Sequence, residues 1–203
     1  MKKIGIFGGT FDPIHFGHID LAKQALLECN LDHLIVIPAK IQPFKVGQAV
    51  VDAAHRLKMA SLAFEDEEKI SVSDLEIKMD DISYTIHTLT EIKKQYPNAY
   101  IAFIIGTDAF LKVEKWRAAS EILTDYSFIV GTRPGYKAEE LSACIVKYTE
   151  VYNTDIRTID NRQWSISSTQ IKERIRAGKS CKNLIPDAVE RYIAVNGLYR
   201  ELY

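Results

Sequence analysis

Two histidines, three positions apart, stand beside two glycines near the start of the chain. The segment 8–18 follows a short apolar run at 4–7, which is typical of a buried strand. Apolar side chains then recur at helical spacing, so the segment is predicted to be a strand-to-helix turn. Glycine lets the backbone approach a ligand closely, and a helix N-terminus carries roughly half a positive charge. His15 and His18 would add donors aimed at the same anion, so the turn is predicted to hold phosphate.

The histidine pair also has two simpler interpretations. His15 and His18 could chelate a metal ion, with Asp12 or His33 as a further ligand, although no clear ligand set accompanies them. They could also only pack against the fold or cap the helix. The neighbouring glycines favour the phosphate interpretation.

Two common phosphate-binding motifs do not fit this chain. Its early glycines, at positions 5, 8, 9 and 17, do not have the G-x-G-x-x-G spacing. The tripeptide Gly178-Lys179-Ser180 resembles the end of a P-loop. However, Glu173 stands where the first glycine of that loop belongs, and no strand is predicted before it. The turn near the N-terminus therefore remains the main candidate site.

Strands and helices alternate along the first half of the chain. Strands are predicted at 4–7, 34–37, 70–75, 101–105 and 126–130, and Asp52 and Ser83 are expected to cap two of the intervening helices. Such alternation is typical of βαβ units. The predicted fold is α/β, with a Rossmann-like parallel sheet flanked by helices and a C-terminal helical segment. Ligands bind beyond the carboxyl ends of such strands.

The segments that follow these strands are expected to share one rim of the sheet. They are the glycine turn and the ranges 38–45, 106–108 and 132–135. At this rim Asp108 could accept hydrogen bonds from a ribose or could merely cap a helix. Trp116 could stack on an aromatic ligand or could belong to the core.

A second candidate anion site lies near the C-terminus. Ser167, Ser168 and Thr169 precede a helix with Ile171 and Ile175 on its apolar face, and a last helix is predicted at about 186–196. Three hydroxyl groups at a helix start, followed by basic side chains, can hold an anion. The same cluster could also be only a helix cap.

The composition is that of an ordinary globular protein. We expect one domain over residues 1–203, with its helical part from about 165. A net charge of −1 without long charged runs favours neither a nucleic-acid partner nor a membrane surface. The three cysteines are far apart and lack a C-x-x-C pair, so free thiols in a reducing compartment are expected, with Cys29 in the core. With no apparent signal segment or membrane span, we expect a cytoplasmic location.

The ordered motifs together resemble a known family. The opening resembles the G-G-T-F-D-P-x-H-x-G-H signature of the nucleotidyltransferase superfamily, and Ile166-Ser167-Ser168-Thr169 resembles its later I-S-S-T motif. Ser83-Tyr84-Thr85, Gly106-Thr107-Asp108, Trp116 and Arg133-Pro134-Gly135 lie between them. This set is similar to that of bacterial nicotinate-nucleotide adenylyltransferases and covers nearly the whole chain.

The resemblance implies a reaction. In that family, ATP and nicotinate mononucleotide (NaMN) give deamido-NAD and pyrophosphate, with Mg²⁺ on the triphosphate and no protein ligand set predicted for it. The NaMN phosphate attacks the α-phosphorus directly, so catalysis would consist of positioning and charge stabilisation. The preference for NaMN over nicotinamide mononucleotide (NMN) does not follow from the residues, and a homo-oligomer stays open.

The resemblance also implies roles for individual residues. His15 and His18 would be catalytic. ATP would be bound by Gly8, Gly9, Thr10, Gly106, Asp108, Ser168, Thr169 and Lys172. The mononucleotide would be bound by Lys45, Arg56, Thr85, Trp116 and Arg133.

Three departures from the family pattern accompany these matches. The usual P-P-H-K loop is Gln42-Pro43-Phe44-Lys45, His87 replaces an acid, and Lys172 replaces an arginine with its bidentate fork. Within the superfamily, a cytidylyltransferase or a phosphopantetheine adenylyltransferase is the alternative. A non-catalytic nucleotide-binding regulator and a metal-binding module are alternatives from other classes.

Overall fold

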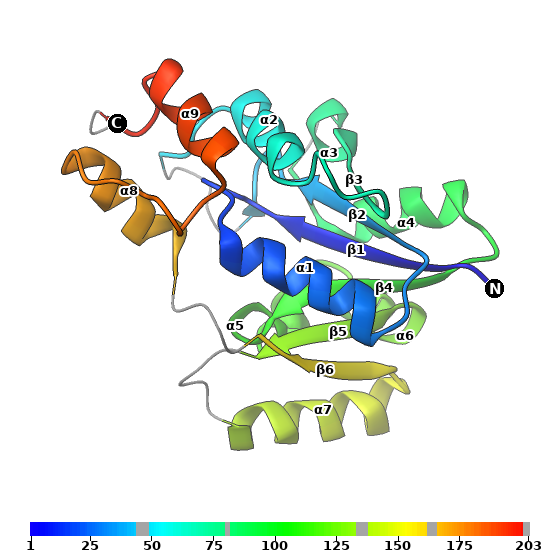
Figure 1. The fold of residues 1–203 in the computed structure, drawn as a ribbon. Helices are drawn as coiled ribbons and strands as arrows, with labels where there is room; N and C mark the ends of the chain where they lie inside the picture. The colour runs from blue at the N-terminus through cyan, green and yellow to red at the C-terminus, as the bar shows by residue number, and fades with distance from the viewer. Residues whose placement is uncertain (44–48, 80–81, 133–137, 162–165, 201–203) are drawn as a thin grey trace.

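The core of the protein is a parallel β-sheet (Figure 1). The structure is a computed structural model that describes residues 1–200 except 44–48, 80–81, 133–137 and 162–165. In these residues six strands form one sheet in the order β3-β2-β1-β4-β5-β6, and each neighbouring pair is parallel. The strands are β1(Lys3–Gly9), β2(His33–Pro38), β3(Ile70–Val72), β4(Tyr100–Gly106), β5(Ser127–Thr132) and β6(Ile156–Asp160). The predicted Rossmann-like sheet is confirmed.

Helices cover both faces of the sheet because its strands alternate their apolar side chains between the faces. Ile4 and Ile6 belong to one hydrophobic cluster and Phe7 to the other. The cluster of Phe7 includes residues from α1(Phe16–Glu28), α2(Ala53–Ala63), α8(Ser168–Arg176) and α9(Asp187–Val195). The cluster of Ile4 includes residues from α4(Thr85–Gln95), α6(Ala119–Asp125) and α7(Ala138–Tyr152). Shorter helical segments are α3(Leu75–Lys78), α5(Thr107–Phe110) and η2(Val113–Lys115).

The carboxyl ends of the central strands lie at one edge of the sheet. Gly9 pairs with Pro38 at the ends of β1 and β2, and Gly106 pairs with Gly131 at the ends of β4 and β5. The strand order reverses between β1 and β4, which is where parallel sheets open a crevice for ligands. The turn after β1 therefore starts at this crevice.

Of the local predictions, one helix cap was confirmed, whereas the other helix cap and the end of one strand were wrong. Asp52 caps α2 as predicted, accepting from the N–H of Ala54 at 2.8 Å. Ser83 does not cap α4, whose N-cap is Tyr84. The Ser83 hydroxyl instead accepts from the N–H of Lys40 at 2.9 Å, which fixes the segment after β2. The strand predicted at 70–75 ends at Val72, because α3 begins at Leu75.

The elements without a prediction include α7 and β6. α7 buries only Leu141 and Tyr148 among its side chains, which is too few for a clear helical stripe. Strand β6 lies at the sheet edge with Arg157 and Thr158 exposed, so it has no continuous apolar run. The cysteines are free thiols and Cys29 is buried, as predicted. Among the described residues, none of the helices is both long enough and apolar enough to cross a membrane.

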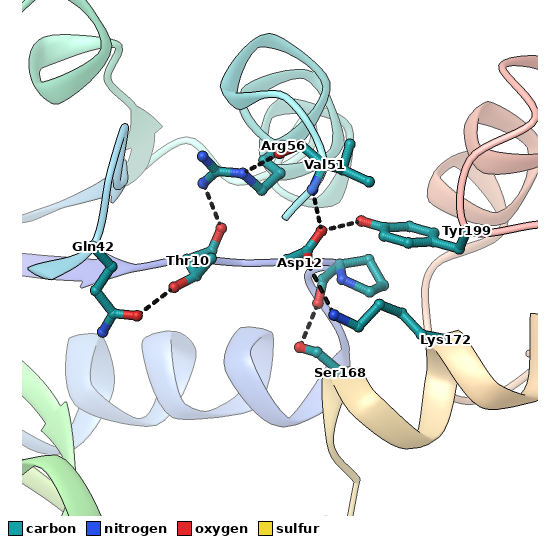
Figure 2. A network of polar contacts seen from close by, with 9 residues as sticks. Thr10, Asp12, Gln42, Val51, Arg56, Ser168, Lys172 and Tyr199 are labelled. Carbon is teal, nitrogen blue, oxygen red and sulfur yellow. Dashed lines mark hydrogen bonds and ion pairs between the residues drawn. The ribbon is translucent and has the colours of Figure 1, made fainter. Parts of the chain in front are cut away.

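A buried cation connects three segments at the carboxyl edge. Arg56 of α2 is 2% exposed, and its guanidinium donates to the carbonyl oxygens of Val51 at 2.8 Å, Thr10 at 2.7 Å and Lys40 at 3.1 Å. Figure 2 shows the first two bonds. Burial lowers the pKa of Arg56, and the nearby Asp12 carboxylate opposes that shift. Three of the five N–H donors of Arg56 are used by backbone carbonyl groups, which favours a structural role, and the prediction that Arg56 binds substrate phosphate stays a prediction.

Replacing this cation should therefore affect stability. Arg56→Met should lower the free energy of unfolding by ~3 kcal/mol or more, because three carbonyl groups lose their partner at ~1–3 kcal/mol each. Arg174→Met is the matched control, since Arg174 is exposed and donates to the carbonyl of Ser180 at 2.8 Å. Its loss should stay below about 1 kcal/mol in urea unfolding. Native stability of Arg56→Met together with a raised KM for a phosphate substrate would contradict this assignment.

Candidate active site

The turn between β1 and α1 carries two stacked imidazoles. His15 occupies the N-cap position of α1 and is 2% exposed, and its carbonyl accepts from the N–H of His18 at 2.9 Å. The ring centroids of His15 and His18 are 3.7 Å apart, with 20° between the ring planes. The Phe11 ring meets His18 edge-on at 5.1 Å. Both imidazoles therefore lie at the positive end of the helix dipole.

Glycine is required before this turn because Phe11 folds back onto the strand. A Cβ on Gly9 would lie 2.7 Å from the Phe11 ring, closer than real contacts allow. A Cβ on Gly8 would lie 3.3 Å from the ring of Phe103. Gly9 thus lets the Phe11 ring pack between the strand and His18, whereas Gly8 leaves room for Phe103.

The first turn of α8 lies directly against the turn after β1. Ser167 is the N-cap of α8 and forms a capping box with Gln170, so Ser168 and Thr169 occupy the first helical positions. The Ser168 hydroxyl donates to the carbonyl of Pro13 at 3.0 Å (Figure 2). Lys172 donates to the carboxylate of Asp12 at 3.0 Å. The two anion sites predicted from distant parts of the sequence are therefore adjacent.

A cavity of about 430 Å³ opens beside the glycines. It is lined by residues that include Gly8, Gly9, Gln42, Tyr84, Thr85 and Trp116. Trp116 is half-buried, with its ring edge-on to Phe103 at 6.1 Å, so it belongs partly to the core and partly to the cavity. This volume and mixed lining are typical of small-molecule sites.

Charged side chains border the cavity. Lys115 and Arg117 line it, and the Arg117 guanidinium lies 4.7 Å above the Tyr84 ring. Glu76 also lines it, is buried, and accepts from the Thr88 hydroxyl at 2.7 Å. Burial raises the pKa of Glu76, which favours its neutral form, although hydrogen bonds from Thr88 and Ser83 oppose the shift. The positive charges of Lys115 and Arg117, together with the raised pKa of Glu76, favour an anionic ligand.

The remaining predicted residues divide into three groups. Gly106 and Asp108 lie where β4 ends, with Gly106 as the N-cap of α5 and Asp108 exposed in its first turn. Thr10 donates from its hydroxyl to Gln42, which lines the cavity, at 2.8 Å. Lys45 and Arg133 lie outside the described residues.

Several residues at the site were not in the predicted set. Glu76 and Arg117 line the cavity, and Tyr199 reaches Asp12 from the end of the chain with a hydroxyl-to-carboxylate distance of 2.7 Å. Asp12 itself carried a signal because it belongs to the opening motif. Tyr199 carried none, since its contact spans 187 positions of sequence.

Comparison with known proteins agrees with this geometry. Residues 6–174 match the family model described as cytidylyltransferase-like. The nicotinate-nucleotide adenylyltransferase of Bacillus subtilis is 37% identical over 199 residues, covering 98% of this chain and 99% of the relative. The Plasmodium falciparum nicotinic acid mononucleotide adenylyltransferase has the same fold. Its structures with NaAD and with APC superpose with TM-scores of 0.83 and 0.82 at 21% identity, over 98% of both chains.

The relatives and the site together define the chain's family. The motifs that carry the resemblance, in the turn after β1 and at the start of α8, lie within the matched region and meet in space. The matched span extends over nearly the full length of both chains, so the cavity as well as the turn lies within it. The chain belongs to the cytidylyltransferase-like family and, within it, to the nicotinate-nucleotide adenylyltransferases.

Proposed function

We propose that this protein transfers the adenylyl group of ATP to nicotinate mononucleotide, with the two substrates meeting at the turn after β1. The observation that carries the proposal is the position of His15 and His18. Their stacked rings lie at the N-terminus of α1, and the first turn of α8 contacts the same turn. The glycines of this turn also line the cavity that contains Trp116. One turn thus joins a site for phosphate to a site for an aromatic ring.

ATP would lie over the turn and the start of α8. Gly8, Gly9 and Thr10 would shape the turn, Gly106 and Asp108 would face the nucleoside, and Ser168, Thr169 and Lys172 would hold the triphosphate. The mononucleotide would place its ring against Trp116 and near Thr85. Both helix N-termini then face phosphate groups, which is the favourable orientation for a helix dipole.

The transfer of the adenylyl group needs only that the two substrates are positioned and that the developing charge is stabilised. An oxygen of the NaMN phosphate forms a bond to the α-phosphorus of ATP while the bond from that phosphorus to the bridging oxygen breaks, and pyrophosphate leaves. Negative charge grows on the bridging and non-bridging oxygens during this exchange. Hydrogen bonds from His15 and His18, together with the ammonium of Lys172, would stabilise that charge in place.

Mg²⁺ would enter this site together with ATP. In the part of the chain that the structure describes, no three His, Cys, Asp or Glu side chains form a group that could hold a metal ion. Mg²⁺ commonly keeps several waters and binds through substrate phosphates with few protein ligands. When bound it would neutralise charge on the departing pyrophosphate.

The charges around the cavity favour the acid over the amide as substrate. Lys115 and Arg117 can attract the ring carboxylate of NaMN, and the burial that raises the pKa of Glu76 acts in the direction that reduces repulsion from that side chain. We expect kcat/KM for NaMN to exceed that for NMN by ~100-fold, or roughly 2.7 kcal/mol. Pyrophosphate release, measured with each mononucleotide in Mg²⁺ and with EDTA as the metal-free control, tests this preference. Activity with neither mononucleotide would contradict the proposed function.

His18 is the most direct test of the phosphate site. His18→Ala should lower kcat by ~10²–10³-fold, the scale of losing one charge-stabilising donor, while circular dichroism shows an intact fold. His33→Ala is a matched control, because His33 lies at the opposite end of the sheet and contacts Ser71 at 2.8 Å. Near-normal turnover of a folded His18→Ala enzyme would remove the assigned mechanism.

A further inference from the structure

Tyr199 connects the end of the chain to the turn after β1. Its hydroxyl donates to Oδ1 of Asp12 at 2.7 Å, and the side chain is 3% exposed (Figure 2). Burial and the adjacent Asp12 carboxylate raise the pKa of Tyr199, so the hydroxyl keeps the proton that it donates. The residue also has a φ of 65°, in the left-handed region that bulky side chains rarely adopt. Such a conformation persists only where surrounding contacts hold it.

The bond to Tyr199 fixes the orientation of the Asp12 carboxylate. Oδ1 receives the Tyr199 hydroxyl and, at 3.4 Å, the N–H of Val51, whereas Oδ2 receives the ammonium of Lys172 at 3.0 Å. Asp12 is 4% exposed, so these protein donors replace most of its hydration. With Oδ1 held by two donors, rotation of the carboxylate is opposed and Oδ2 stays directed at Lys172.

The C-terminal part of the chain holds the same turn at further points. Ser168 donates to the carbonyl of Pro13 at 3.0 Å, and the N–H of Phe16 donates to the carbonyl of Leu184 at 3.0 Å. The Asn161 side chain donates to the carbonyl of Gly17 at 3.1 Å. The residues on both sides of His15 therefore have their positions set by residues from the last quarter of the chain.

We propose that Tyr199 is a positioning residue for ATP, acting through Asp12 on Lys172 and on the turn that carries the histidines. The inference rests on the proposed function, because it takes Lys172 and this turn to bind the triphosphate. Tyr199 itself touches no substrate. Its hydroxyl holds the carboxylate that keeps the Lys172 ammonium beside the turn, so the ATP site is complete only when the segment that carries Tyr199 is docked.

Tyr199→Phe tests this inference, since it keeps the aromatic ring and removes only the hydroxyl. We expect KM for ATP, and Kd for a non-hydrolysable ATP analogue by calorimetry, to rise about 5- to 10-fold, the scale of one typical net hydrogen bond lost. KM for NaMN should change less than about twofold. A Tyr199→Phe enzyme with a lower melting temperature but unchanged ATP KM and analogue Kd would overturn the inference.

Tyr192→Phe is the matched control. Tyr192 lies on α9 in the same part of the chain, and its hydroxyl contacts the His55 ring at 2.9 Å. Removing that hydroxyl should leave ATP affinity unchanged, and an equal weakening in both variants would overturn the inference by showing a general effect of loosening this part of the chain.

A second variant and a double-mutant cycle keep the test decisive. If Tyr199→Phe fails to fold, Asp12→Asn keeps an oxygen that accepts from Tyr199 and removes the ion pair to Lys172, so it tests the second half of the linkage and should also weaken ATP-analogue binding. Combined with Lys172→Met, Tyr199→Phe should weaken analogue binding little further, because both changes remove the same linkage. Fully additive effects of the two substitutions would overturn the inference.

Analogue binding needs no turnover, so it separates this inference from the proposed function. Wild-type protein that binds the analogue but is inactive with NaMN would contradict the proposed function alone.

Discussion

A buried carboxylate and a buried guanidinium hold the turn on which this site depends. Removing Asp12 and Arg56 from water costs free energy that only close partners can offset. Asp12 obtains those partners from Lys172, Tyr199 and Val51, and Arg56 obtains them from three backbone carbonyl groups. The partners belong to segments that are far apart in the sequence. Each buried charge therefore stabilises the turn only when those segments are already folded around it.

The sheet explains why this turn can serve two substrates. β1 and β4 are neighbours whose connections lead in opposite directions, so the segment leaving β1 stands at the crevice between two halves of the fold. On one side lies the first turn of α8, whose helix dipole favours an anion. On the other lies the cavity bordered by Trp116 and Arg117, which suits an aromatic ring with a negative substituent. The backbone of Gly8 and Gly9 lies at the boundary between these regions.

The sequence predicted those strands and turn residues whose structure depends on neighbouring positions in the chain. The apolar runs that became β1, β4 and β5 were found because buried parallel strands need continuous apolar side chains. The histidines and glycines of the turn were singled out because their types and spacing suit phosphate. The structure places that turn beside Ser168, a contact that the sequence did not predict.

The features that escaped prediction depend on tertiary contacts. Ser83 resembles a helix cap in sequence, but the N–H groups of the segment after β2 compete for its hydroxyl. Arg56 resembles a phosphate ligand, yet three carbonyl groups surround it in the fold. Strand β6 has exposed side chains at the sheet edge, and Tyr199 meets Asp12 only after the whole chain has folded. None of these contacts leaves a periodic or local pattern.

We propose that the protein positions two phosphates for direct exchange and forms no covalent bond to either. The stereochemical course at the α-phosphorus tests it most directly, using ATP made chiral at that atom by a single sulfur substitution, with NaMN as acceptor. A single in-line displacement inverts the configuration, and inversion in the dinucleotide product is the result that we expect. Retention would mean two successive displacements through an adenylylated protein side chain, and would rule out direct exchange.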